Sequence, residues 1–150
     1  GTGLVGGQWL NRVLSDHGRP DVVYAMASKK TYPSWGYMIE KGATTIWERW
    51  DGYVVGRGFQ NPGMNSLNHW AFGAVGEWMW RHIAGINPDP EQPGYKHFLI
   101  RPRPGGGLTR PLATTGAGTI ASTSRSVSLP PVVKHMTTLH CFLTASAISR

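Results

Sequence analysis

The segment from Thr31 to Met64 constrains the fold of this 150-residue chain more than any other feature, because it combines many helix-breaking residues with aromatic rings. Five aromatic side chains lie between Tyr32 and Trp50 and argue against disorder. A long loop inside a compact domain is usually functional. The sequence therefore predicts an ordered, functional loop without regular structure. Its breakers are Pro33, Gly36, Gly42, Gly52, Gly56, Gly58, Pro62 and Gly63.

Two segments with helical spacing precede this loop. Residues 4–15 and 21–29 carry recurring apolar side chains, and Gly18 and Pro20 between them supply a stop and a new start. We expect these two helices to pack as an antiparallel pair.

A third helix is predicted over residues 65–83, with Asn65 or Ser66 as its N-cap. Gly73 and Gly76 each cost it up to about 1 kcal/mol of helix propensity. We expect close approach of a neighbouring helix or ligand to compensate for them. The tryptophans of the predicted helices are assigned to packing: Trp9, Trp70, Trp78 and Trp80.

A strand follows the third helix. Residues 87–94 form a proline-rich connection, and residues 95–101 alternate as a strand with Phe98 and Ile100 on one face. Three glycines, residues 105–107, are expected to make the next turn.

One carboxylate stands among the aromatic residues of the loop. Glu48 lies between Trp47 and Trp50, with Arg49 beside it. Aromatic faces suit the C–H faces of sugars, and a carboxylate among them can activate water or stabilise a cationic transition state. The alternative is structural, with core tryptophans and Glu48 paired to Arg49 or a helix terminus. Adjacent residues of an extended segment point to opposite faces, so we expect Arg49 to face away from Glu48 and to hold the loop.

Three ordered blocks of the sequence resemble a single enzyme family. They read PSWGYMIEKGATTIWERWD at residues 33–51, NSLNHWAFGAVGEWMWRHIAGI at 65–86 and PGYKHFLIRPRPGGGLT at 93–109. In order and spacing they resemble the C-terminal part of the catalytic region of bacterial α-L-rhamnosidases. The opening TGLVGGQWLNRVLSDHGRPDVVYAMA resembles the same family.

The resemblance implies a mainly α fold. Residues 1–86 are expected to form the last helices of an (α/α)6, or six-hairpin, barrel, and residues 87–108 a linker and the first strand of a C-terminal β-sandwich. Residues 109–150 match no part of the family and contain no acidic residue. For them we expect disorder, a shifted reading frame or a low-complexity linker. The chain begins at Gly1, and we interpret it as a piece of a longer enzyme.

The resemblance also implies roles for particular side chains. In the family, the Glu of the WE-R-W segment is the general base of an inverting mechanism, which implies that role for Glu48. The general acid lies in an earlier segment of the family, so this chain alone is expected to be inactive. His69 is implied as a sugar contact, and Trp35, Trp47 or Trp50 can wall the C6 methyl of rhamnose, although each indole can equally belong to the core.

The remaining carboxylates before the linker are expected to have structural roles in caps, turns and surface pairs. Glu40, for example, is expected to pair with Lys41. None of them is offered as the general acid. They are Asp16, Asp21, Glu40, Asp51 and Glu77.

Charge and composition narrow the range of partners. The net charge is +7, but four units belong to residues 109–150, whose cations are scattered, so nucleic-acid binding is not predicted. No apolar run approaches the roughly 18 to 20 residues of a membrane span. Cys141 is the single cysteine and is interpreted as an ordinary thiol. The expected partners are rhamnose-containing glycosides or polysaccharides, with no cofactor and no metal.

Two other functions stay open on the sequence alone. One is another (α/α)6 glycosidase or a polysaccharide lyase, and a lyase would use a Tyr, His or Lys base. The other is a non-catalytic carbohydrate-binding protein with an aromatic platform. The carboxylate of Glu48 favours hydrolysis.

Overall fold

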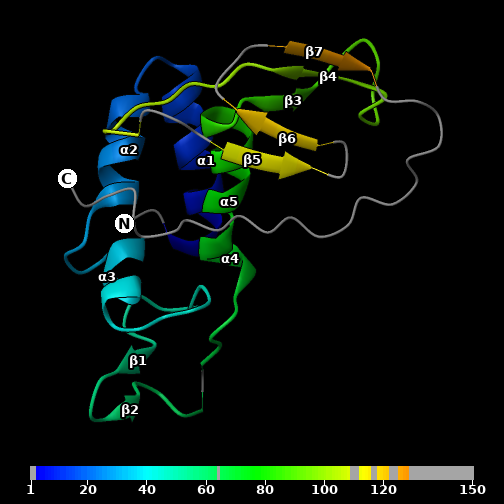
Figure 1. Ribbon diagram of the computed structural model, residues 1–150. Coiled ribbons are helices and arrows are strands. Elements are labelled where there is room, and N and C mark those ends of the chain that lie inside the picture. Colours follow the sequence, from blue (N-terminus) through cyan, green and yellow to red (C-terminus); the bar gives the residue numbers. More distant parts are fainter. Residues whose placement is uncertain (1–2, 64, 109–111, 116–117, 122–124, 129–150) are drawn as a thin grey trace. The chain divides into compact units, whose positions relative to one another are not determined.

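The structure is a computed structural model that describes residues 3–63, 65–108, 112–115, 118–121 and 125–128 (Figure 1). The chain divides into two compact units, Gly1–Val75 and Gly76–Arg150. None of the helices in the described ranges is long and apolar enough to span a bilayer.

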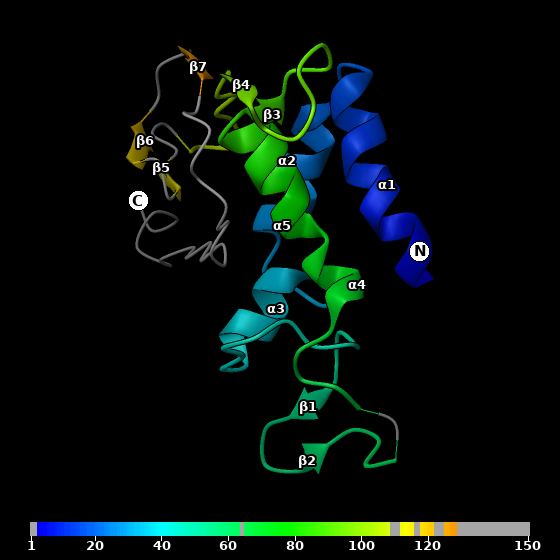
Figure 2. The same cartoon turned by 90° about the vertical axis from the view of Figure 1, so that its right-hand side faces the viewer.

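The first unit begins with the predicted antiparallel helix pair. Helices α1 (Gly3–Asp16) and α2 (Pro20–Ser28) lie side by side and run in opposite directions (Figures 1 and 2). Gly18 adopts a φ of 78° just after α1, and Pro20 occupies the first turn of α2, as the sequence indicates. The pair is therefore confirmed.

The buried face of α1 differs from the expected one. Asn11 and Ser15 are buried, whereas Trp9 is 55% exposed and Val5 and Val13 share its exposed face. Helix α1 packs against α2 and α4, and its buried residues include these two polar side chains. The packing role assigned to Trp9 is therefore wrong for this structure.

The loop predicted over residues 31–64 contains a short helix that the sequence did not indicate. Helix α3 (Trp35–Glu40) begins at Ser34, whose hydroxyl accepts a hydrogen bond from the Tyr37 amide at 2.9 Å. Gly36 counted as a helix breaker. In the structure it permits a close approach, because a Cβ there would lie 2.3 Å from the Lys29 carbonyl oxygen.

The rest of the loop forms an antiparallel hairpin and ordered turns. Strands β1 (Tyr53–Val54) and β2 (Gly58–Phe59) pair Tyr53 with Phe59. Within the first unit, the hairpin extends beyond α3 and α4 (Figures 1 and 2). Met38 and Trp47 are buried hydrophobic residues of this loop.

The third predicted helix is divided into three short pieces. These are α4 (Trp70–Gly73), α5 (Val75–Trp78) and a π-helical turn, η1 (Met79–Ile83). The N-cap is His69, not Asn65 or Ser66, because residues 66–69 are hydrogen-bonded to residues 45–48 instead.

The glycines of this segment do not have the predicted neighbours. A Cβ at Gly73 or Gly76 would meet no atom within 4 Å among the described residues, so no described helix makes the expected close approach, and the ligand alternative stays a prediction. Gly73 instead marks the end of α4. Of the tryptophans assigned to packing here, Trp78 is buried and Trp80 packs on the core of the second unit, but Trp70 is 65% exposed.

The second unit contains a three-stranded antiparallel sheet in the order β3 (Ile86–Pro88), β4 (His97–Ile100), β7 (Arg125–Ser128). The predicted alternation is confirmed in β4, where Phe98 and Ile100 are buried. Tyr95 lies outside the strand because its φ is 57°. The core cluster consists of Ala84, Ile86, Phe98 and Ile100, with Trp80 and Tyr95 packed against it.

Two expectations about this unit are corrected. Asn87 and Pro88 belong to strand β3 rather than to a linker, because they pair with Leu99 and Phe98. Within residues 109–150, strand β7 and the hairpin of β5 (Leu112–Thr115) and β6 (Gly118–Ala121) are extended where disorder was expected; for the other positions the expectation stays a prediction.

Each of these late strands contains β-branched residues, which favour extended backbone. The remaining positions of 109–150, including Cys141, lie outside the described residues. The division at 86/87 and 108/109, the complete barrel and the sandwich stay predictions.

Candidate functional site

Two extended segments of the first unit hold the candidate site. The Glu48 amide donates to the Ser66 carbonyl at 2.9 Å, and the His69 amide donates to the Ile46 carbonyl at 2.8 Å. The Thr45 hydroxyl donates to the Leu67 carbonyl between them. This backbone ladder brings residues 48 and 69 together although 21 positions separate them in the sequence.

The side chains of Glu48 and His69 approach each other from these two segments. His69 Nε2 lies 3.9 Å from Glu48 Oε1, and the side chains are 22% and 19% exposed. The separation exceeds that of a direct hydrogen bond. The structure thus brings together the two residues that the sequence singled out most strongly.

His69 is anchored by the helix that follows it. Its Nδ1 accepts a hydrogen bond from the Ala71 amide at 3.2 Å, which caps α4, and its ring stacks on Trp70 at 5.9 Å between centroids. The imidazole is therefore held by one nitrogen, and the other nitrogen faces Glu48.

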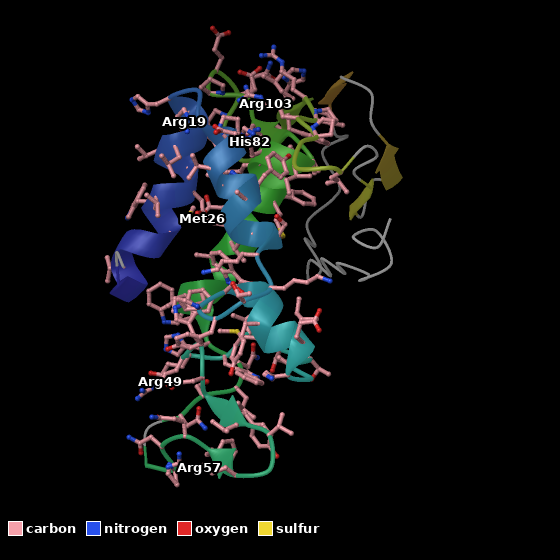
Figure 3. All side chains as sticks on the ribbon, turned by 90° about the vertical axis from the view of Figure 1, so that its left-hand side faces the viewer. Arg19, Met26, Arg49, Arg57, His82 and Arg103 are labelled. Atoms are coloured by element: carbon pink, nitrogen blue, oxygen red, sulfur yellow. The ribbon has the colours of Figure 1, made fainter. Side chains whose placement is uncertain are left out.

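Arg49 takes no part in this contact. Its Nε lies 3.5 Å from Asp51 Oδ1, and the side chain lies between α3 and the β1–β2 hairpin (Figure 3). The expectation that Arg49 holds the loop and faces away from Glu48 agrees with this pairing.

The other carboxylates of the first unit are engaged by permanent cations. Glu40 pairs with Lys30 rather than with the expected Lys41. In residues 3–63 and 65–75, Glu48 is the carboxylate that faces an imidazole and not an Arg or Lys side chain. The other pairs are Arg12–Asp16, Arg19–Asp21, Lys30–Glu40 and Arg49–Asp51.

Trp35 and Trp50 form one aromatic cluster with Phe72. The Trp35 and Trp50 rings meet edge to face at 5.2 Å, and Trp50 stacks on Phe72 at 3.8 Å. Trp35 Nε1 also donates to the Phe72 carbonyl at 3.0 Å. Sequence reasoning missed Phe72 because it lies off the stripe of a continuous helix, although the aromatic NHWAF run contains it.

Trp47 has a different environment. It is 4% exposed, and its ring lies 6.3 Å from that of Tyr53. A Cβ at Gly52 would stand 3.3 Å from the Trp47 Cβ, so the turn closes tightly over this residue. For Trp47 the geometry favours the core alternative.

The match with a known family decides what kind of protein carries this site. Residues 1–83 match the family model for the bacterial alpha-L-rhamnosidase 6 hairpin glycosidase domain. The chain belongs to this family. The curated relatives that match it are named alpha-L-rhamnosidases.

Curated α-L-rhamnosidases are similar over most of the chain. The Streptomyces avermitilis enzyme is 53% identical over 113 residues, or 75% of this chain, and a Formosa agariphila enzyme is 49% identical over 123 residues, or 81%. The chain spans 11% and 13% of the lengths of these two relatives.

Solved rhamnosidase structures are similar to the chain as well. The Streptomyces avermitilis α-L-rhamnosidase complexed with L-rhamnose has a TM-score of 0.66 and 46% identity, covering 86% of this chain and 12% of that one. The Aspergillus terreus enzyme has a TM-score of 0.63 and 39% identity, covering 72% and 12%.

Proposed function

We propose that this member of the α-L-rhamnosidase family supplies the general-base side of a site that cleaves terminal α-L-rhamnosyl bonds with inversion, and that Glu48 is the base. The observation that carries the proposal is the largely buried Glu48 carboxylate, which faces an imidazole while neighbouring carboxylates are paired with Arg or Lys. A base needs a lone pair free to accept a proton, and a bidentate cation would occupy it.

The general acid comes from outside these 150 residues. Inverting glycosidases hold two carboxyl groups about 6.5–9.5 Å apart, so that water fits between the base and the sugar. The four other carboxylates of the first unit are engaged in ion pairs, and the chain spans about a tenth of its relatives.

The sugar contacts are His69 and the cluster of Trp35 and Trp50. A neutral imidazole can hydrogen-bond a ring hydroxyl, and the cluster offers an apolar wall for the C6 methyl of rhamnose. Trp47 supports Glu48 from the core, since its indole has almost no exposed surface. The L-rhamnose in the Streptomyces avermitilis structure supports this sugar as the ligand class.

A chimera tests the assignment of the base. In the Streptomyces avermitilis enzyme, the matching segment is replaced by this chain, and Glu48→Gln is introduced. We expect kcat to fall by about 10²–10⁴, the usual contribution of a general base. Glu40→Gln is the matched control, because Glu40 is exposed and paired with Lys30, and it should leave kcat unchanged. Undiminished turnover by the Glu48→Gln chimera would show that Glu48 is not the general base.

The isolated chain provides a second test. Because it lacks the acid, we expect no hydrolysis of a chromogenic α-L-rhamnoside above the uncatalysed rate. Measurable release of the chromophore by the purified chain, abolished by Glu48→Gln, would show that the acid lies within these residues.

A further inference from the structure

We propose that the Ala71 amide fixes the tautomer of His69, so that the ring presents Nε2–H toward Glu48 and the two side chains together hold the attacking water. This inference rests on the proposed role of Glu48 as the base. It assigns the Nε2–H of His69 to the water in place of a ring hydroxyl.

The tautomer follows from what each group can do in a hydrogen bond. A backbone amide only donates, and the Ala71 nitrogen lies 3.2 Å from His69 Nδ1. Nδ1 must therefore offer its lone pair. A neutral imidazole with a lone pair on Nδ1 carries its proton on Nε2.

Two other histidines of the chain have the opposite arrangement. His17 Nδ1 lies 2.9 Å from the Val13 carbonyl oxygen, and His97 Nδ1 lies 2.8 Å from Asp89 Oδ2. Both partners are acceptors, so Nδ1 carries the proton in these rings. The orientation of His69 is thus a property of its cap and not a general feature of the chain.

The gap between His69 and Glu48 suits a hydroxyl-type oxygen. To one side of the line that joins Nε2 and Oε1, which are 3.9 Å apart, one oxygen can lie about 2.8 Å from both atoms. It would accept a hydrogen bond from Nε2–H and donate one to the carboxylate. Water meets both demands, whereas an ether or carbonyl oxygen has no proton to donate.

The step that this geometry serves balances in atoms and protons. The water oxygen bonds to the anomeric carbon while Glu48 takes its proton, and the glycosidic C–O bond breaks. The leaving oxygen takes a proton from the acid outside this chain. His69 keeps its proton throughout and only orients the water.

The positions of both side chains are set by backbone. The ladder between residues 45–48 and 66–69 fixes the two Cα atoms, and the cap fixes the ring. Both side chains are about four-fifths buried, which limits competing water. A donor held in this way needs no reorganisation during the reaction.

Nitrogen NMR on the 15N-labelled 150-residue chain tests the tautomer without any activity. We expect a coupling across the hydrogen bond between the Ala71 amide nitrogen and His69 Nδ1, together with a protonated Nε2 at neutral pH. His97 in the same spectrum is the control and should carry its proton on Nδ1. A proton on His69 Nδ1, or the absence of the coupling, would overturn the inference and leave the role of Glu48 untouched.

Two substitutions in the rhamnosidase chimera separate capping from water positioning. His69→Asn keeps an acceptor for the Ala71 amide but has no donor near the Nε2 position, so kcat should fall about 10²-fold in a normally folded protein. His69→Gln places an amide donor near that position and loses the cap, so it should retain more kcat with a lower Tm.

The pattern of these variants distinguishes the two proposals. Parental kcat in His69→Asn, or a His69→Gln variant no more active than His69→Asn, would refute water positioning. If water positioning is refuted but Glu48→Gln in the same chimera is inactive, Glu48 remains the general base and only the proposed role of His69 is wrong.

Discussion

Gly85 and Arg101 are joined so closely that no side chain fits between them. The Arg101 amide donates to the Gly85 carbonyl at 2.8 Å, and a Cβ at position 85 would lie 1.9 Å from the Arg101 carbonyl oxygen. Gly85 also adopts a φ of 72°. This contact extends the β3–β4 pairing by one residue pair beyond Ile86 and Ile100. It lies just after the end of η1.

Gly85→Ala should lower the free energy of unfolding of the second unit by more than about 2 kcal/mol. The left-handed conformation alone costs about 1–2 kcal/mol with a Cβ, and the clash with backbone at Arg101 adds to it. Urea unfolding followed by hydrogen exchange at residues of β4 measures the change.

Gly107→Ala is the matched control for this prediction. Gly107 has a φ of 87°, but a Cβ there would meet nothing within 4 Å among the described residues. Gly107→Ala should lower the free energy of unfolding only by the cost of the left-handed conformation, about 1–2 kcal/mol. Equal losses in the two variants would mean that the Arg101 contact does not restrict position 85.

Gly36→Ala and Gly7→Ala should have opposite effects on the first unit. Both glycines are helical, yet a Cβ at Gly36 would lie 2.3 Å from the Lys29 carbonyl oxygen, whereas a Cβ at Gly7 would meet no atom within 4 Å in the part of the chain that the structure describes. Gly7→Ala should stabilise by up to about 1 kcal/mol through helix propensity, and Gly36→Ala should destabilise. Thermal unfolding followed by circular dichroism compares them, and a shared sign would contradict the packing at Gly36.

Gly36 also illustrates which parts of the fold could not be predicted from the sequence. Helices α1 and α2 could be predicted because their signals are local: apolar spacing, Gly18 and Pro20. Helix α3 could not, since the benefit of Gly36 depends on a carbonyl seven residues away. The face of α1 was also beyond prediction, because the neighbouring helices decide whether Trp9 or Asn11 is buried.

In the candidate site, too, local signals could be predicted and long-range contacts could not. Glu48 and His69 were found from their motifs, and their distance follows from hydrogen bonds between segments that no local pattern indicates. Those bonds also hold residues 66–69 extended, which is why the predicted N-cap was placed too early. The three loop tryptophans could not be told apart by sequence, because burial depends on the turn at Gly52.

Tryptophan substitutions test which indoles are buried and which are exposed. Trp47→Ala should lower the free energy of unfolding by about 3–5 kcal/mol, as expected for a buried aromatic residue. Trp9→Ala should change it by about 0.5 kcal/mol or less, because more than half of that side chain is exposed. Urea titration of the two variants gives both values. A larger loss at Trp9 would contradict the observed orientation of α1.

Asp89 should make the turn between β3 and β4 sensitive to acid. The Glu91 amide and the His97 ring both donate to its carboxylate, at 2.9 and 2.8 Å, and they hold the pKa of Asp89 below its ordinary value. A lowered folded-state pKa stabilises the fold above the unfolded-state value of about 3.9. That contribution is lost as pH falls through the folded-state pKa.

Carbon NMR of the Asp89 carboxyl group during acid titration measures this pKa directly. We expect its midpoint below that of an ordinary aspartate, and a loss of the β3–β4 amide protection at the same pH. Asp89→Asn is the control, because it retains an acceptor for the Glu91 amide but cannot titrate, and it should remove this acid transition. A midpoint at or above about 3.9 would mean that the two donors do not stabilise the charged carboxylate.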